Sequence, residues 1–313
     1  MQQVVATLTL NPSLDRSSEV EQVVPERKLR CAEPAHEPGG GGINVARAIR
    51  RLGGEATAAW ASGGATGELL RALIEQEQVP QTPVPIDALT RQNLMIHESS
   101  SGQEYRFGFP GAHLTSAEVD RCCAALRELE PRAQLVVLSG SLPPGVPADL
   151  YARIANESAP ARVVVDTSGD ALRRAVQHGG LFLIKPNKHE LEQLAGDALE
   201  SDEALERAAR RLVDDGQVEV VMVSLGAAGV LVVSGAGAQR VRSPTVQIRS
   251  KVGAGDSTVA GVVLGLARDW ELPDAVRLGV AAGAAAVMTP GSELCRREDA
   301  ERLLECLRRE ACA

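Results

Sequence analysis

The feature that most constrains the fold is a repeated alternation of short apolar runs with amphipathic helical patterns. The apolar runs are continuously hydrophobic, as in "QLVVLSGS" (134–141) and "VEVVMVSLG" (218–226), which is typical of strands buried on both faces. Helical patterns such as "INVARAIRRLG" (43–53) and "DSTVAGVVLGLARD" (256–269) accompany them. This alternation predicts an α/β fold with three layers, α/β/α, around a mostly parallel central sheet. The predicted strands are 3–10, 57–62, 134–141, 162–169, 181–187, 218–226 and 229–234.

Two polar segments interrupt the alternation, at about residues 14–36 and 91–110. Both predict short strands, and "SSSG" (99–102) predicts the turn of a hairpin. We expect these two insertions to pair into a small β-sheet lid on a single domain that spans residues 1–313. An exposed apolar face on such a sheet favours a partner, which predicts a homodimer through the lids.

Composition excludes several classes of protein. The formal net charge is −8 and aromatic residues make up 2%, which argues against nucleic-acid binding. No apolar run approaches the ~20 residues of a membrane helix, and the start lacks the basic region of a signal peptide. We therefore expect a cytoplasmic protein with no membrane partner. The six cysteines lack metal-ligand spacing and predict reduced thiols (residues 31, 122, 123, 295, 306 and 312).

The stretch "VGAGDS" places three small residues, Gly253, Ala254 and Gly255, before Asp256 at a predicted helix start. In one interpretation Asp256 simply caps the helix. In the other, the bare backbone amides form an anion site at the positive end of the helix, and Asp256 is a base that takes a hydroxyl proton. The second interpretation explains why three small residues precede the acid.

The glycine run in "EPGGGGINVARAIRRLG" (37–53) enters another predicted helix. A dinucleotide site is disfavoured, because the run does not directly follow the first strand and "TAAWASGG" ends without an acidic residue. We predict instead that Gly40 and Gly41 let a polar ligand approach the backbone while Asn44 bonds a hydroxyl. The alternative is a plain turn at a helix start.

Two further stretches follow predicted strands. In "LIKPNKHE", Lys185 suits a nucleotide phosphate, and Asn187 with Glu190 suit Mg²⁺ held largely through water. The alternative for Asn187 and Glu190 is a capping box. "SLGAAG" (224–229) is either a simple turn or a place where a nucleotide lies against the backbone. Ligands gather at the carboxyl ends of parallel strands, so these features point to one site.

Basic residues and one acid belong to the two insertions. Lys28 and Arg30 lie in the first insertion and Arg91 begins the second, and these side chains suit the phosphate of a phosphorylated substrate. Asp15, just after the first strand, is a candidate to bond sugar hydroxyls. For an isolated arginine the ordinary alternative is a solvated surface position.

The motifs "GGGGINVARA", "KPNKHE", "SLGAAG" and "VGAGDS", in this order and separation, resemble those of the ribokinase-like (PfkB) carbohydrate kinases over nearly the full length. The resemblance implies the ribokinase-like fold, ATP and Mg²⁺, and a dimer formed through the lids. It implies Asp256 as catalytic base with Gly253, Ala254 and Gly255 as anion hole. It assigns to the sugar phosphate Asp15, Gly40, Gly41, Asn44, Arg91 and Ser139, with Lys28 and Arg30 reaching it from the neighbouring subunit. It assigns to the nucleotide side Lys185, Asn187, Ser224, Gly226, Gly229, Ser250 and Val252, with Asn187 and Glu190 toward Mg²⁺.

Two departures from the family pattern matter. Ser250-Lys251 stands where many members have Asp-Thr, which leaves dependence on K⁺ open. Gly41 stands where kinases of fructose 1-phosphate usually have lysine, which favours a 6-phosphate substrate.

The resemblance therefore implies ATP-dependent phosphorylation of fructose 6-phosphate. Phosphorylation of tagatose 6-phosphate or fructose 1-phosphate is the alternative within the family. A nucleoside kinase of the same family is disfavoured, because few aromatic residues are present to hold a base and the lid is basic. The alternative from a different class is non-catalytic binding of a nucleotide or sugar phosphate.

Overall fold

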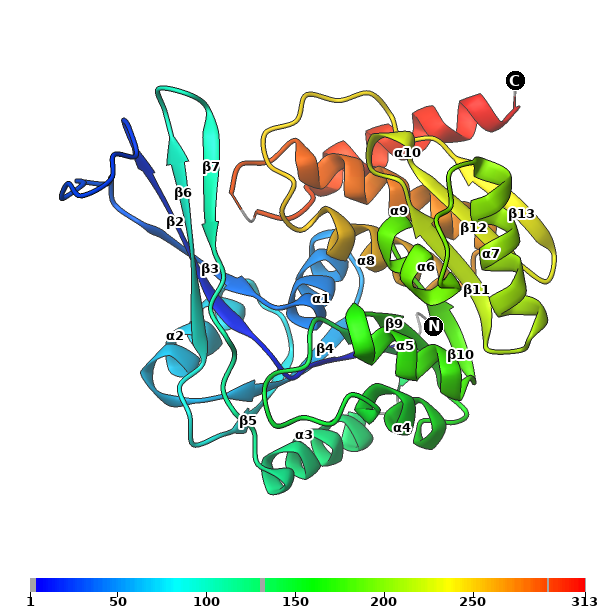
Figure 1. The fold of residues 1–313 in the computed structure, drawn as a ribbon, viewed down its shortest axis with the longest axis horizontal. Helices are drawn as coiled ribbons and strands as arrows, with labels where there is room; N and C mark the ends of the chain where they lie inside the picture. Colours follow the sequence, from blue (N-terminus) through cyan, green and yellow to red (C-terminus); the bar gives the residue numbers. More distant parts are fainter. Residues whose placement is uncertain (1–3, 130–132, 292, 313) are drawn as a thin grey trace.

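The computed structural model describes residues 4–129, 133–291 and 293–312, and consists of two sheets with helices packed on both faces of the larger one (Figure 1). The strands are β1 Val4–Thr9, β2 Ser13–Val20, β3 Ala35–Gly39, β4 Ala56–Ser62, β5 Gln81–Pro85, β6 Arg91–Glu98, β7 Gln103–Phe107, β8 Ala133–Ser139, β9 Arg162–Asp166, β10 Leu181–Ile184, β11 Val218–Ser224, β12 Val230–Ser234 and β13 Gly237–Val241. The helices are α1 Gly41–Arg51, α2 Gly64–Gln76, α3 Ser116–Leu129, α4 Leu150–Glu157, α5 Gly169–His178, α6 Lys188–Ala195, α7 Asp202–Asp214, α8 Ala254–Ala267, α9 Leu272–Val287 and α10 Arg297–Cys312, with a short 3₁₀ turn at Gly226–Ala228.

The larger sheet has nine strands among the described residues, in the order β13-β12-β11-β10-β9-β8-β1-β4-β5. All neighbours from β11 to β5 pair in parallel, and only the β11–β12 and β12–β13 pairs are antiparallel. The prediction of a mostly parallel sheet is confirmed. The parallel strands are apolar throughout because helices cover both of their faces.

Two hydrophobic cores lie on opposite faces of this sheet. One contains side chains of α1, α2, α8, α9 and α10, and the other contains side chains of α3, α4, α5, α6 and α7. Neighbouring strand residues divide between the two cores, as with Val137 and Val136 of β8. This is the predicted three-layer α/β/α arrangement.

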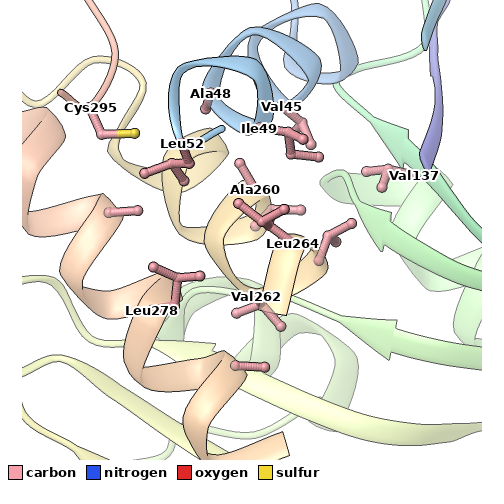
Figure 2. Close-up of a cluster of buried hydrophobic side chains, with 14 of the residues drawn as sticks. Val45, Ala48, Ile49, Leu52, Val137, Ala260, Val262, Leu264, Leu278 and Cys295 are labelled. Carbon is pink, nitrogen blue, oxygen red and sulfur yellow. The ribbon is translucent and has the colours of Figure 1, made fainter. Parts of the chain in front are cut away.

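Helix α8 is the central helix of the first core. Its side chains Ala260 and Leu264 lie between those of α1, such as Ile49, and those of α9, such as Leu278 (Figure 2). Helices α8 and α9 approach so closely that a Cβ on Gly261 would lie 2.7 Å from the Cα of Gly279. Such packing fixes the position of the N-terminus of α8, where the sequence predicts the anion site.

The second sheet, called the small sheet below, has the order β3-β2-β6-β7. Strands β2 and β6 pair in parallel, and β6 and β7 form an antiparallel hairpin around residues 99–102. The pairing of the two insertions and the position of the hairpin turn are therefore as predicted. The small sheet stands beside the helical layer that contains α1 and α8 (Figure 1).

Several elements have no counterpart in the sequence prediction. Strand β5 is one of them, because "QTPVP" contains two prolines, which are tolerated here at the edge of the sheet. Strand β13 and helices α4 and α5 are the others. The first predicted strand begins at residue 3, which lies outside the described residues.

Other expectations concern cysteines and membranes. Cys31, Cys122, Cys123, Cys295 and Cys306 are free thiols, as predicted. The side chain of Cys312 lies outside the described part of the structure. Burial raises the pKa of the Cys122 thiol to about 12, so this cysteine is unreactive. Within the described residues, no helix is both long and apolar enough to pass through a membrane.

Candidate active site

The carboxyl ends of the parallel strands bring the predicted residues to one edge of the larger sheet. Ser139 and Ser224 are the last residues of β8 and β11, and Lys185 directly follows β10. Asp166, the last residue of β9, joins them although the sequence analysis did not select it. Its only sequence signal is its position at the end of the apolar run "RVVVD". Open parallel sheets bind ligands at this edge.

Helix α8 begins with exposed backbone rather than with a side-chain cap. Gly253 is the N-cap residue in a left-handed conformation (φ 73°), and no side chain caps the helix. Asp256 lies within the first turn, so the interpretation in which Asp256 caps the helix is wrong. The first amides of a helix have no partner within the helix and carry its positive end. Gly253, Ala254 and Gly255 therefore form a site suited to an anion.

The Asp256 carboxylate is held by a residue from the start of another helix. The side-chain amide of Asn44, in α1, donates to Asp256 Oδ2 over 2.9 Å. Loss of hydration raises the pKa of Asp256 to about 6, and the charges of Asp166 and Asp15 add to this effect. The Asn44 hydrogen bond and the Lys185 ammonium act in the opposite direction. A carboxyl group with such a pKa is poised as a base near neutral pH.

Lys185 and Asp166 form a buried ion pair beside this carboxylate. The Nζ–Oδ1 distance is 3.1 Å, and the Lys185 side chain is almost inaccessible to solvent. Burial alone would lower the pKa of Lys185, but the charges of Asp166, Asp256 and Glu190 raise it. A Cβ on Gly255 would come within 3.4 Å of Lys185 Nζ. The ammonium therefore lies over the amides at the start of α8.

The N-terminus of α1 is a second helix start whose N-cap residue has no side chain. This residue, Gly40, has φ 112°, and within the first turn the Ile43 amide donates to Thr9 Oγ1 (2.9 Å). A Cβ on Gly41 would overlap Ser139 Oγ and lie 2.8 Å from the Gly140 amide. The Ser139 hydroxyl is buried without a protein partner. This hydroxyl is therefore free to bond an oxygen of a molecule bound beside the glycine run.

Asp15 is brought to the same region by the small sheet. Its carboxylate accepts hydrogen bonds from Ser13 Oγ (2.7 Å) and Asn93 Nδ2 (2.9 Å). Burial raises the pKa of Asp15, and these two hydrogen bonds oppose the rise. Asp15 and Asn93 line a cavity of about 210 Å³, together with Val252 from the loop before α8. Asn93 is a site residue that the sequence analysis missed, because only the β2–β6 register places it opposite Asp15.

The guanidinium of Arg91 lies at the junction between the small sheet and the larger one. It donates to the carbonyl oxygens of Phe109 (3.1 Å), Asn11 (3.1 Å) and Pro12 (3.4 Å). Burial lowers the pKa of Arg91, and the charge of Asp15 opposes this. Five N–H groups are available on a guanidinium, so two remain for a ligand.

Asn187 and Glu190 form the capping box of α6 that the sequence analysis gave as an alternative. Asn187 Oδ1 accepts from the Glu190 amide (2.9 Å), and Glu190 Oε2 accepts from the Asn187 amide (2.8 Å). Ser224 pairs with Asn187 through an isolated β-bridge. In the described part of the chain, no three His, Cys, Asp or Glu side chains gather as a metal-binding group. Binding of Mg²⁺ through water at Asn187 and Glu190 stays a prediction.

The remaining predicted residues lie around this centre. Gly226 is exposed with φ 59°, whereas Gly229 is buried, and a Cβ there would overlap the Val241 carbonyl. Packing alone thus accounts for the glycine at 229. Ser250 is buried and its hydroxyl accepts from the Val252 amide (3.2 Å).

Lys28 and Arg30 are exposed residues of the segment between β2 and β3. This segment lies at the end of the small sheet, away from α8 (Figure 1). Within one chain, the fold does not bring these two side chains to the edge of the larger sheet. The expectation that they act toward a neighbouring subunit stays a prediction.

Comparisons of this chain with family models, protein sequences and solved structures agree with one another. Residues 4–299 match the family model described as "pfkB family carbohydrate kinase". The chain is 45% identical over 305 residues to ATP-dependent 6-phosphofructokinase isozyme 2 of Mycobacterium tuberculosis, covering 96% of this chain and 89% of that protein. It is 44% identical over 307 residues to the protein of the same name from Escherichia coli, covering 97% and 99%. The crystal structure of phosphofructokinase-2 from Escherichia coli in complex with potassium superposes with a TM-score of 0.94, at 43% identity, covering 98% and 100% of the two chains.

Proposed function

The chain belongs to the pfkB family of carbohydrate kinases, and from that premise we propose that it transfers the γ-phosphoryl group of ATP to O1 of fructose 6-phosphate. The products are fructose 1,6-bisphosphate and ADP. The observation that carries the proposal is the position of Asp256. This carboxylate lies within the first turn of an uncapped helix, accepts a hydrogen bond from Asn44, and is close enough to the Lys185 ammonium for its pKa to respond to that charge.

Asp256 acts as the general base. It accepts the proton of the O1 hydroxyl, and the oxygen attacks the γ-phosphorus in line with the leaving ADP oxygen. The amides of Gly253, Ala254 and Gly255 stabilise the charge on the transferring phosphoryl group, because they already point into the space before α8. Small residues are needed here so that the phosphoryl group can approach the backbone.

The nucleotide side is built on the ends of β10 and β11. Lys185 neutralises phosphate charge, and Ser224 and Gly226 lie where the nucleotide rests on backbone. Asn187 and Glu190 would hold Mg²⁺ through water, and the ion would screen the charges of the β- and γ-phosphates. The exposed Asn187 side chain and the partly exposed Glu190 are accessible for this role.

The sugar-phosphate side is built on the small sheet and the glycine run. Asp15 accepts hydrogen bonds from sugar hydroxyls, and the Asn44 amide donates to them. Ser139 and the amide of Gly41 bind oxygens, and Arg91 uses its two remaining N–H groups on the 6-phosphate. Gly41 leaves space beside Ser139 that a larger residue would fill.

The decisive experiment is MgATP-dependent ADP release by the purified protein with four acceptors: fructose 6-phosphate, tagatose 6-phosphate, fructose 1-phosphate and adenosine. We expect the highest kcat/KM with fructose 6-phosphate. A higher value with tagatose 6-phosphate or fructose 1-phosphate would keep the mechanism and change the substrate. The absence of turnover with all four would favour a non-catalytic binding protein.

Replacement of Arg91 by alanine is expected to raise the KM for fructose 6-phosphate about 10- to 100-fold with little change in kcat. Charge-assisted hydrogen bonds to a phosphate that does not react contribute equally to the ground state and the transition state. Initial-rate kinetics with varied fructose 6-phosphate measure this. Arg121→Ala is the matched control, since Arg121 also donates to a backbone carbonyl, that of Pro85, but lies on α3. An unchanged KM in Arg91→Ala would remove Arg91 from the site.

A monovalent-cation site is also proposed, between the loop before α8 and the loop after α9. The Ser250 amide joins the two loops by donating to the Val287 carbonyl (3.3 Å). The Thr289 hydroxyl lies 2.7 Å from the Ala286 carbonyl oxygen and 2.5 Å from that of Glu293. One hydroxyl proton serves only one of these oxygens at a time. Converging carbonyl oxygens of this kind suit K⁺.

We therefore expect kcat/KM to fall when K⁺ is replaced by tetramethylammonium at constant ionic strength. Lys251, an exposed cation next to Ser250, should weaken K⁺ binding by charge repulsion. Lys251→Gln is then expected to lower the K⁺ concentration that gives half-maximal activity. Equal rates in the two salts would exclude a functional cation site. The measurement is a K⁺ titration of the rate with each protein.

A homodimer through the small sheets is proposed from the face of β6 and β7 that points away from Asp15. The register pairs Leu94 with Phe107 and Ile96 with Tyr105 on this face. The Phe107 side chain is 47% exposed. An apolar face of this kind suits a second copy of the chain, which would also bring Lys28 and Arg30 of one subunit toward the other.

A cytoplasmic location stays a prediction.

Ile96→Asp combined with Phe107→Asp is expected to give monomers in sedimentation velocity, because burying two carboxylates at the interface is unfavourable. The KM for fructose 6-phosphate should rise in the same variant, since each site loses the basic residues of its neighbour. Leu89→Asp is the control, as Leu89 is 64% exposed but lies beside Gly64 at the start of α2. A dimer that persists in the double variant would contradict this interface.

A further inference from the structure

Arg47 lies behind the Asp256 carboxylate, within a buried chain of polar contacts. It belongs to α1, one turn after Asn44, and is only 1% exposed. Its Nη1 donates to Asn44 Oδ1 (3.0 Å) and to the Pro38 carbonyl (2.7 Å). Its Nε and Nη2 donate to Glu77 Oε1 (3.0 and 2.5 Å). A buried arginine is normally paired, and here part of its hydrogen bonding is directed at a residue that contacts the proposed base.

The direction of these hydrogen bonds fixes the Asn44 amide. A guanidinium carries only hydrogen-bond donors, so only the oxygen end of the Asn44 amide can face it favourably. The nitrogen end must then face the other way, where it donates to Asp256 Oδ2 over 2.9 Å. Rotation of the amide by 180° would set its oxygen against a carboxylate and its NH₂ group against a cation. Both contacts would be repulsive.

We propose that Arg47 is a positioning residue for the kinase reaction: it locks the Asn44 amide so that the Asp256 carboxylate always meets a hydrogen-bond donor. This inference rests on the proposed function of Asp256 as base. Glu77, at the end of α2, holds the guanidinium in place. Its carboxylate also pairs with Arg51, with 3.4 Å between Arg51 Nε and Glu77 Oε2. The chain Glu77–Arg47–Asn44–Asp256 therefore connects the surface of the α1 layer to the reacting group.

Loss of Arg47 should change the base itself. The groups that face Asp256 are Asn44, Lys185, Asp166 and Asp15, and among them Asn44 and Lys185 favour the ionised form. Without Arg47 the Asn44 amide can adopt both orientations, and its hydrogen bond to Asp256 is then weakened. The pKa of Asp256 then rises, and a smaller fraction of the enzyme has an ionised base at neutral pH. A residue that only stabilises the fold would lower the melting temperature without this effect.

The test compares the full-length protein with Arg47→Met, measuring kcat and the pH dependence of kcat/KM with fructose 6-phosphate and MgATP. We expect kcat to fall about 10- to 100-fold, as for a misplaced catalytic group. The acid limb of the profile should move above that of the unaltered protein, which is expected near pH 6. Arg50→Met is the matched control, because Arg50 is an exposed arginine of the same helix. A lower kcat with an unmoved acid limb would overturn the proposal.

A double-mutant cycle provides the second measurement. In an Asn44→Ala background, Arg47→Met should lower kcat by less than about a further twofold, because the contact that connects Arg47 to Asp256 is already absent. Losses that multiply would overturn the proposal. If Arg47→Met fails to fold, Arg47→Met with Glu77→Gln removes the buried guanidinium together with the charge of its half-buried partner, and serves in the same cycle. Failure of the proposed function is a different result: the unaltered protein would then show no kinase activity with fructose 6-phosphate.

Discussion

Replacing Asp256 by asparagine is expected to lower kcat with fructose 6-phosphate about 10²- to 10⁴-fold, the range for loss of a general base. The amide keeps the size and much of the hydrogen bonding of the carboxylate but cannot accept the O1 proton. The KM values should change far less than kcat, since the amides of residues 253–255 and the binding side chains remain. Steady-state kinetics at saturating MgATP measure the effect. Near-normal turnover would contradict the role of Asp256.

The same variant provides its own control for folding. The pKa of Asp256 is raised from 3.8 to about 6, so the folded protein binds this proton more tightly than the unfolded chain. Ionisation of Asp256 therefore costs stability, and the contribution of this group to the free energy of unfolding should rise as the pH falls from about 6 toward 4. The substitution Asp256→Asn removes this cost at pH 7. We expect the variant to melt no lower than the unaltered protein, so that lost activity reports chemistry.

Replacing Lys185 by methionine is expected to lower kcat/KM for MgATP about 10²- to 10³-fold, as for removal of one preorganised electrostatic group from an active site. Lys185 is buried against the start of α8 and is held by Asp166, so its charge has a fixed position beside the anion site. Methionine preserves the length of the side chain and removes the charge. Kinetics with varied MgATP check this expectation.

Lys188→Met is the matched control for Lys185→Met. Lys188 lies three residues later in the same motif, is exposed, and pairs with Glu192 at 3.8 Å along α6. Its loss should leave kcat/KM within about twofold, as is usual for an exposed ion pair. Equal losses in the two variants would indicate that total charge near the nucleotide matters rather than the position of Lys185.

The sequence by itself determined the fold class and the edge of the sheet at which the candidate site residues gather. The continuous apolar runs required a parallel sheet covered on both faces, and the candidate residues at the strand ends were therefore expected at one edge. The runs "VGAGDS" and "GGGG" indicated two helix starts that expose backbone. These inferences succeed because they depend on local properties: the period of hydrophobicity, and small residues that leave amides bare.

Only the tertiary structure decided which side chains meet. Asp166 and Lys185 come from different strands, and Asn93 reaches Asp15 only through the β2–β6 register. The local sequence is compatible with Asp256 as a cap, but Gly253 takes that position. Arg47 belongs to a predicted helix that contains three arginines, and only the folded protein buries it and pairs it with Glu77, which follows α2. Hydrogen-bond direction and burial depend on contacts between segments far apart in the chain, and no local pattern encodes them.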